Sequence, residues 1–172
     1  MKSFDIKASA QKTIRLEAEA IAALEEGIND EFVKAVEAIG NTKGRLVISG
    51  IGKSAIIAHK IVATLNSTGT PAIFLHAADA IHGDLGMIQN DDVVMIISKS
   101  GESPEIKVLI PFIKNFGNTI IGMSGKKDSY LSQHSDIVLD TIVSQEACPN
   151  NLAPTSSTTA QLVMGDAIAV AL

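Results

Sequence analysis

Three stretches of the chain combine glycine or hydroxyl side chains with charged residues that can act in catalysis. They are "SGIGKSA" at residues 49–55, "SKSGESPE" at residues 98–105 and "SQEACPNNLAPTSSTTAQ" at residues 144–161. Hydroxyls and backbone amides at the start of a helix bind phosphate groups. Glutamate and lysine side chains transfer protons and stabilise developing charge. The residue types therefore point to a phosphorylated ligand with acid–base chemistry beside it.

The first stretch contains two glycines, Gly50 and Gly52, that let the backbone come close to a ligand, and then Lys53 and Ser54. Its spacing is too short for the phosphate loop G-x-x-x-x-G-K-[ST] and does not match the dinucleotide-binding pattern G-x-G-x-x-G. A lysine at a helix start opposes the helix dipole, so this position favours a nearby anion. Taken alone, a solvated lysine on a glycine turn is an equally good interpretation.

The second stretch has the signals of a helix start and more hydroxyls than a helix start needs. Ser103 can cap the helix, Pro104 suits its first position, and Glu105 falls in its first turn, where a carboxylate is favourable. Capping does not explain Ser98 and Ser100. We therefore predict that the three serines form a neutral cradle for a phosphate, with ordinary loop chemistry as the alternative.

The third stretch repeats this excess of hydroxyls. Ser156, Ser157 and Thr158 stand among five consecutive hydroxyl residues, at 155–159, whereas an N-cap needs only one. Glu146 lies upstream, in a segment too long for a plain connection. We interpret the hydroxyls as ligand-binding; a surface loop with a solvated glutamate is the alternative.

The histidines and the cysteine do not form a metal-binding pattern. His59, His76, His82 and His134 lack zinc-site spacing, and the single Cys148 cannot complete a structural site. We predict no metal and no other cofactor. His82, in "IHGDLG", is flanked by a turn glycine and an acid, although taken singly each histidine is best interpreted as a surface or core residue.

The elements that position these stretches alternate between helices and strands. Apolar residues recur at helical spacing over 7–40, with a break at 27–30, and a final helix is expected over about 158–172. Pro111 is expected to kink the helix that follows Glu105. Short apolar runs typical of parallel strands are "RLVIS", "AIFLH", "DVVMIIS", "TIIGMS" and "DIVLD". They predict a three-layer α/β/α sandwich with a five-stranded parallel sheet: one domain over 1–172, with an N-terminal helical segment at 1–43 and an α/β core at 44–172.

Composition limits the possible partners and surroundings of the chain. With 172 residues, 46% hydrophobic, it can form one well-buried domain. Aromatic residues are only 3% and the net charge is −5, which argues against nucleic acid and anionic membranes as partners. One cysteine, no signal peptide and no long apolar run indicate a soluble cytoplasmic protein. The final "GDAIAVAL" has no helix stop signal, so we expect the natural protein to continue.

A family resemblance agrees with these patterns. "SKSGES" resembles the S-x-S-G-[ED]-[ST] signature of sugar-isomerase (SIS) domains, which bind phosphosugars on a flavodoxin-like sandwich. "GIGKSA", "HGDLG" and "EACPNNLAPTSSTT" extend the similarity, from about Gly44 to Leu172, to arabinose 5-phosphate isomerases. That family interconverts D-ribulose 5-phosphate and D-arabinose 5-phosphate, a precursor of the lipopolysaccharide sugar Kdo.

The resemblance implies roles for individual residues. Four residues match catalytic positions of the family: Lys53, Glu105, Glu146 and His82. The phosphate-binding positions of SIS domains are matched by Ser98, Ser100, Ser103 and the run from Ser156 to Thr158. Lys99 stands where the family usually has asparagine. The family's further catalytic histidine and the pair of CBS domains of many members would lie beyond Leu172. A homo-oligomer is expected to share its sites between subunits, either as a dimer or, in preference, as a tetramer.

Aldose–ketose isomerisation proceeds through an enediol, which requires a carboxylate base and a positive group at the oxyanion. We expect Glu105 or Glu146 to be that base, with its pKa raised toward neutrality by burial, and Lys53 to be the positive group. The alternative function is a non-catalytic regulatory module that binds a phosphosugar, which needs the serines but not all three charged residues. A purely structural oligomerisation domain would leave the three stretches unexplained.

Overall fold

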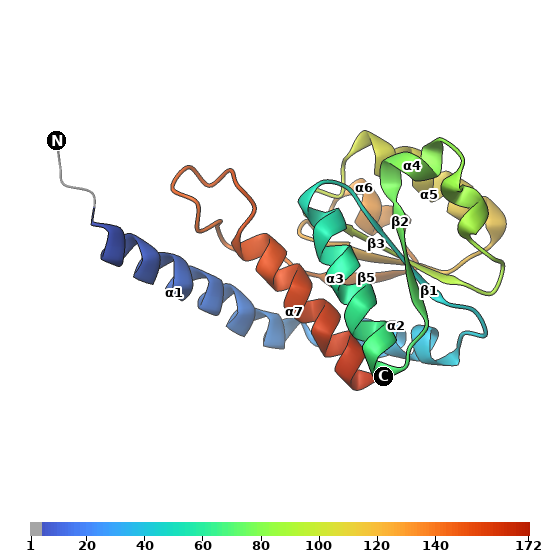
Figure 1. Cartoon of the computed structure of the whole chain (residues 1–172), viewed down its shortest axis with the longest axis horizontal. Coiled ribbons are helices and arrows are strands. Elements are labelled where there is room, and N and C mark those ends of the chain that lie inside the picture. Colours follow the sequence, from blue (N-terminus) through green and yellow to red (C-terminus); the bar gives the residue numbers. More distant parts are fainter. Residues whose placement is uncertain (1–4) are drawn as a thin grey trace.

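The computed structural model describes residues 5–172 and contains a five-stranded parallel sheet with helices on both faces (Figure 1). The strand order is β2-β1-β3-β4-β5, with every neighbouring pair parallel. The strands are β1 (Leu46–Gly50), β2 (Ala72–His76), β3 (Val93–Ser98), β4 (Ile120–Ser124) and β5 (Ile137–Asp140). The predicted three-layer α/β fold and all five predicted strands are confirmed.

The helices alternate with the strands as the sequence predicts. They are α1 (Ile6–Leu24), α2 (Asp30–Asn41), α3 (Lys53–Thr68), α4 (Ala77–Ile81), α5 (Pro104–Phe116), α6 (Tyr130–His134) and α7 (Ser156–Ala171), with 3-10 turns η1 (Glu25–Gly27) and η2 (Asp84–Met87). The expected break falls at η1, after which Asn29 caps α2 by accepting from the Glu31 amide. The helix of α5 runs on through Pro111, and α7 begins two residues before the expected 158.

Two apolar cores cover the two faces of the sheet. On one face the sheet packs against α2, α3 and α7, and on the other against α4, α5 and α6. Successive residues of β1 belong to different cores: Val47 lies in the second and Ile48 in the first, and both are fully buried. Burial on both faces explains why the strands are continuous apolar runs.

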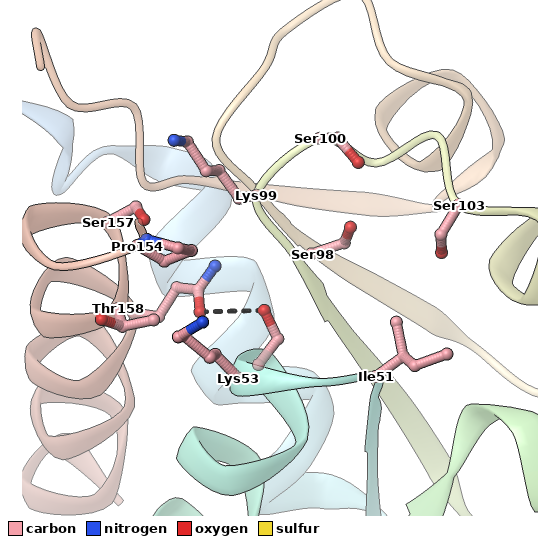
Figure 2. Close-up of a pocket in the computed structure, with 11 residues that line it drawn as sticks. Ile51, Lys53, Ser98, Lys99, Ser100, Ser103, Pro154, Ser157 and Thr158 are labelled. Atoms are coloured by element: carbon pink, nitrogen blue, oxygen red, sulfur yellow. Dashed lines mark hydrogen bonds between the residues drawn. The ribbon is translucent and has the colours of Figure 1, made fainter. Parts of the chain in front are cut away.

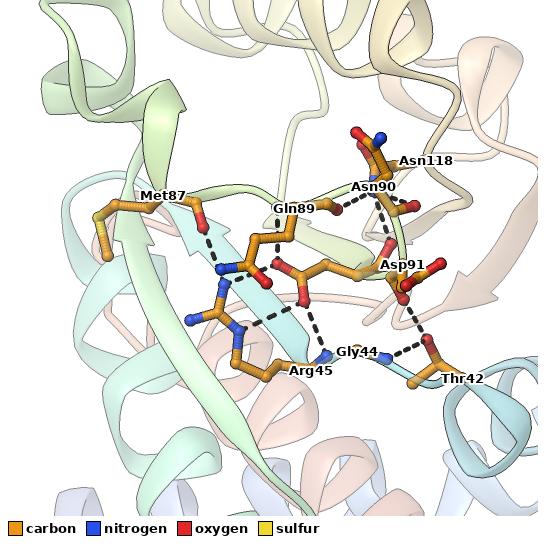
Figure 3. Close-up of polar contacts among 9 residues, drawn as sticks. Thr42, Gly44, Arg45, Met87, Gln89, Asn90, Asp91 and Asn118 are labelled. Atoms are coloured by element: carbon orange, nitrogen blue, oxygen red, sulfur yellow. Dashed lines mark hydrogen bonds and ion pairs between the residues drawn. The ribbon is translucent and has the colours of Figure 1, made fainter.

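A polar cluster holds the amino-terminal edge of the sheet (Figure 3). The buried carboxylate of Asp92 accepts hydrogen bonds from the Arg45 amide at 2.8 Å and from Arg45 Nη2 at 2.9 Å. Burial raises the pKa of Asp92, but the Arg45 bonds and the Gln89 amide outweigh it, so the pKa lies below its ordinary value. Asn118 donates to the carbonyls of Gln89 and Asp92. The starts of β1, β3 and β4 are therefore fixed together, and the opposite edge carries the loops of interest.

The first helix stands apart from the α/β core. In Figure 1, α1 extends away from the sheet and lies beside α7. The Thr159 hydroxyl donates to the Glu17 carboxylate at 3.1 Å, which ties the two helices together. None of the helices within residues 5–172 is both long enough and apolar enough to cross a membrane.

Candidate active site

A pocket of about 310 Å³ lies at the carboxyl ends of β1 and β3 (Figure 2). In this strand order, β1 and β3 are neighbours whose connections leave on opposite faces, and such a switch point is where open α/β sheets bind ligands. The walls come from three segments far apart in the chain. The lining residues are Ile51, Lys53, Ser54, Ser98, Lys99, Ser100, Ser103, Pro154, Ser157, Thr158 and Gln161.

The amino-terminal ends of three helices converge on this pocket (Figure 2). The cap of α3 is Gly52, whose φ of 58° favours glycine, and it offers no side chain to the first-turn amides. The cap of α5 is Ser103, whose hydroxyl makes no capping hydrogen bond. Helix N-termini carry partial positive charge. The starts of α3 and α5 therefore leave backbone donors for an anion.

The serine hydroxyls of the loop between β3 and α5 are available to donate hydrogen bonds to a ligand. Ser98 Oγ accepts from the Gly101 amide at 3.0 Å, and Ser100 Oγ accepts from the Glu102 amide at 3.3 Å. The Ser103 hydroxyl is buried and has no hydrogen-bond partner within residues 5–172. A hydroxyl that accepts from the backbone keeps its own proton to donate. This loop can therefore donate hydrogen bonds to a phosphate.

The same loop is braced from behind by the start of α6. Gly101, at a φ of 63°, passes so close to Ser129 that a Cβ would collide with its side chain. The Leu131 amide donates to the Gly101 carbonyl at 3.0 Å, and the Tyr130 amide to Glu102 Oε1 at 2.8 Å. The other oxygen of Glu102 pairs with Lys107 at 2.8 Å. These contacts fix the loop before any ligand binds; no local pattern indicated the bracing role of Glu102.

Glu146 is buried behind the pocket and surrounded by donors. It is 3% exposed. It accepts from Ser157 Oγ at 2.5 Å and from the Thr155 amide at 2.8 Å, and Lys99 Nζ lies 2.5 Å from its Oε1. Burial raises the pKa of Glu146, but Lys99, Ser157 and the backbone amides outweigh it and lower the pKa to about 2. The expectation of a raised pKa is therefore wrong for Glu146, because its donors stabilise the charged form more than burial destabilises it.

The structure brings most of the predicted phosphate ligands together. Six of them line the pocket: Ser54, Ser98, Ser100, Ser103, Ser157 and Thr158. Lys53, predicted to be catalytic, lines it too, whereas Gly50 and Gly52 lie at the adjacent turn between β1 and α3 and are not among the lining residues. The Ser156 side chain is instead buried, with its hydroxyl unpaired among the described residues, and does not line it. Ser156 therefore belongs to the packed start of α7, one helical position away from the pocket wall.

Three of the four predicted catalytic residues do not line the pocket: Glu105, Glu146 and His82. Glu105 is half-buried in the first turn of α5, and His82 is exposed at the end of α4. Gln161 does line the pocket and accepts from Ser54 Oγ at 3.2 Å. Sequence reasoning missed it, although its position four residues after Ser157 places it on the same helix face.

The described residues offer no ready metal centre. Within residues 5–172, no three His, Cys, Asp or Glu side chains gather in a group that could hold a metal ion. The groups that this part of the chain presents to a ligand are side-chain hydroxyls, lysine ammonium groups, an amide side chain and backbone amides.

Fold and pocket together define a flavodoxin-like α/β sandwich with a pocket of hydroxyl and ammonium groups at the carboxyl ends of β1 and β3. The SIS domain family matches residues 40–171, and the chain belongs to this family. The chain is 53% identical over 171 residues to the arabinose 5-phosphate isomerase KdsD of Pseudomonas aeruginosa, covering 99% of this chain and 52% of that protein. It is 47% identical to KdsD of Escherichia coli K12, covering 98% of this chain and 52% of that protein. The chain thus spans about half the length of these curated relatives.

A solved structure extends this likeness to three dimensions. The Escherichia coli CFT073 protein c3406, determined in complex with arabinose 5-phosphate, superposes with a TM-score of 0.94 at 38% identity. The match covers 99% of this chain and 91% of that one. The fold of the whole described chain, including the long α1, is therefore shared with that protein.

Proposed function

We propose that this chain carries the active site of an aldose–ketose isomerase that interconverts D-ribulose 5-phosphate and D-arabinose 5-phosphate through an enediol. The product would supply Kdo and lipopolysaccharide biosynthesis. The observation that carries the proposal is the pocket itself. In it, Lys53 at the end of β1 shares one cavity with the hydroxyls of the β3–α5 loop and of α7. The likeness to KdsD proteins and to a structure that holds arabinose 5-phosphate supports this choice of substrate.

The isomerisation moves a proton between adjacent carbons, which needs a base and a positive group near the oxygen that gains charge. We assign the proton transfer to Glu105 or Glu146 and the charge stabilisation to Lys53. Within residues 5–172 the Glu105 carboxylate has no hydrogen-bond partner, whereas Glu146 has several. The donors around Glu146 lower its pKa to about 2, which makes it a weak base in this arrangement.

We further propose a homo-oligomer, a dimer or a tetramer, in which His82 serves the pocket of a neighbouring subunit. In its own chain His82 is exposed and does not line the pocket. Exposed apolar side chains support assembly: Ile6 and Ile14 on α1 are 75% and 68% exposed, and Ile56, three residues after Lys53, is 69% exposed. Sedimentation should show the oligomer at micromolar concentration. A strict monomer would contradict both the assembly and the shared site.

A cytoplasmic location belongs to the same proposal. The single cysteine cannot form a disulfide within the chain, which suits a reducing compartment.

One observation favours a second candidate, a non-catalytic module that binds a phosphosugar and regulates another activity. No carboxylate of residues 5–172 lines the pocket, and the pKa of the buried Glu146 is lowered to about 2, so this part of the chain places no strong base at the pocket wall. An isomerase assay of the protein with D-ribulose 5-phosphate separates the two functions. Turnover to D-arabinose 5-phosphate supports the enzyme, whereas tight binding of the sugar phosphate without turnover supports the regulatory module.

A further inference from the structure

Lys99 lies between the open pocket and a buried carboxylate. Its side chain lines the pocket and is 43% exposed, whereas the side chain of Glu146 is 1% exposed. The Lys99 Nζ lies 2.5 Å from Glu146 Oε1. In Figure 2, Lys99 reaches from the loop that carries Ser98 and Ser100 toward the start of α7. One ammonium group is thus within reach of both the protein's own anion and the place where a ligand's anion would bind.

The backbone of Lys99 is held in place by its neighbours, so only its side chain can change position. Gly125, the residue that follows β4, passes so close that a Cβ there would lie 2.8 Å from the Lys99 carbonyl oxygen. The Gly125 amide also donates to the Ser98 carbonyl at 3.4 Å. Lysine has a flexible four-carbon stem, so its charge can move while its Cα stays in place.

Glu146 keeps its position without Lys99. Its Oε2 accepts from the amides of Thr155 and Ser157 at 2.8 and 3.2 Å, and its Oε1 accepts from the Ser157 hydroxyl at 2.5 Å. Lys99, from the β3–α5 loop, is the cation paired with it among the described residues, and the Cys148 thiol on its own loop is the other titratable neighbour. Departure of Lys99 would therefore expose a lone pair on Oε1 of a carboxylate that α7 still holds.

We propose that Lys99 is a positioning residue shared by two anions: it pairs with Glu146 in the ligand-free protein and turns to the phosphate when a ligand enters. A phosphate ester carries more negative charge than a carboxylate at neutral pH. The Lys99 side chain is 43% exposed and so has room to move, and when it leaves, the Thr155 and Ser157 amides and the Ser157 hydroxyl still stabilise the charge of Glu146. The inference rests on the proposed function only in taking a phosphate as the ligand.

The movement of Lys99 from Glu146 to the phosphate links ligand binding to the basicity of Glu146. Burial raises the pKa of Glu146, and Lys99 is the strongest of the contacts that lower it. When Lys99 turns away, the pKa of Glu146 should rise by about 1–3, which is the range typical of losing a close opposite charge. The carboxylate would then become a better base only after the phosphate is seated.

Binding of inorganic phosphate, measured by calorimetry, tests whether Lys99 moves from Glu146 to a bound phosphate. The test does not require any isomerase activity. Four proteins form a double-mutant cycle: the natural protein, Lys99→Gln, Glu146→Gln and the double variant. Lys127→Gln is the matched control, because it removes the same charge from a side chain that is 77% exposed and outside the pocket. Circular dichroism and melting establish that each variant is folded.

If Lys99 pairs with either anion, the effects of Lys99→Gln and Glu146→Gln on phosphate affinity should depend strongly on each other. Lys99→Gln should weaken phosphate binding about tenfold, as expected for one charge-assisted contact. Glu146→Gln should tighten it several-fold where Lys99 is present, since the lysine is then free, but by less than about twofold in the Lys99→Gln background. The Lys127→Gln control should bind like the natural protein. Independent effects of the two substitutions, or unchanged binding in Lys99→Gln, would overturn the proposal and leave Lys99 as a static tie between two loops.

Carbon-13 NMR of the Glu146 carboxyl gives a second readout on the natural protein, with the Glu146→Gln variant needed only to assign the signal. Phosphate should move this signal in the natural protein and leave it in place in Lys99→Gln. A signal that ignores phosphate in both proteins would overturn the inference. Isomerase turnover alongside that result would leave the proposed function standing, so the two failures are distinguishable.

Discussion

Ser157 contacts the Glu146 carboxylate twice, through its hydroxyl to Oε1 at 2.5 Å and through its amide to Oε2 at 3.2 Å. Ser157 also lines the pocket. The buried carboxylate therefore lies directly behind a residue that would touch the ligand. A single helix start, that of α7, is placed to hold an anion of the protein and to face an anion of the ligand.

This relationship makes the stability of the fold sensitive to acid. The pKa of Glu146 is about 2 in the folded protein against an ordinary value of 4.5, so its stabilising effect is complete above the ordinary pKa and is lost as the pH falls from 4.5 toward 2. Denaturant unfolding between pH 7 and pH 3 should show a falling free energy of unfolding. The fall should be smaller in Glu146→Gln, where Asp92, whose pKa is also lowered, remains to contribute. The same pH dependence in both proteins would contradict this assignment.

The serines of the β3–α5 loop should act in binding and not in the chemical step. Ser100→Ala and Ser103→Ala each remove a donor to a phosphate that is bound in both the ground state and the transition state. KM should rise while kcat stays nearly unchanged. Steady-state kinetics with D-ribulose 5-phosphate measure this. A large loss of kcat at constant KM would place these hydroxyls in the reaction itself.

Replacing Glu105 or Glu146 by Gln should lower kcat to different extents. Gln at the residue that carries the proton should lower kcat by roughly 10²–10⁴, whereas Gln at the other should have a smaller effect. Glu105 and Glu146 are each replaced, circular dichroism confirms folding, and kcat is followed against pH. If both variants kept a kcat near that of the natural protein, neither glutamate would be the base.

Lys53 should stabilise negative charge that develops on the substrate oxygen. Lys53→Ala should lower kcat by roughly 10²–10³, comparable to the loss of one oxyanion donor. Lys60→Ala on the same helix is the matched control, since Lys60 pairs with Asp166 at the surface and does not line the pocket. Equal kinetics for the two variants would remove Lys53 from the chemistry.

Gly101 should be needed for the shape of the phosphate loop. In Gly101→Ala the alanine must adopt a left-handed backbone conformation, which costs about 1–2 kcal/mol. Its Cβ would also collide with the Ser129 side chain. Gly69→Ala isolates the backbone cost, because Gly69 has a φ of 98° and open space around its Cβ position. The melting temperature should fall further for Gly101→Ala than for Gly69→Ala. Similar melting temperatures would mean that the contact with Ser129 is readily relieved.

Local patterns in the sequence determined the layers of this protein and the loops that carry its site. The runs that became β1 and β3 are apolar at nearly every position because both of their faces are buried, and a buried strand imposes that requirement on each consecutive residue. The excess of hydroxyls at Ser98 and Ser100 was visible for a related reason, since capping is a local need and any surplus stands out.

The tertiary structure alone decided how these residues act on one another. Lys99 and Glu146 meet at 2.5 Å although 47 positions separate them in the chain, and no spacing in the sequence encodes that pair. The sign of the Glu146 pKa shift depends on it, because burial and nearby donors act in opposite directions and only their distances fix which prevails. The exclusion of Glu105, Glu146 and His82 from the pocket wall has the same origin. A motif places a residue at the end of a strand or helix, but the packing of the elements determines which cavity its side chain reaches.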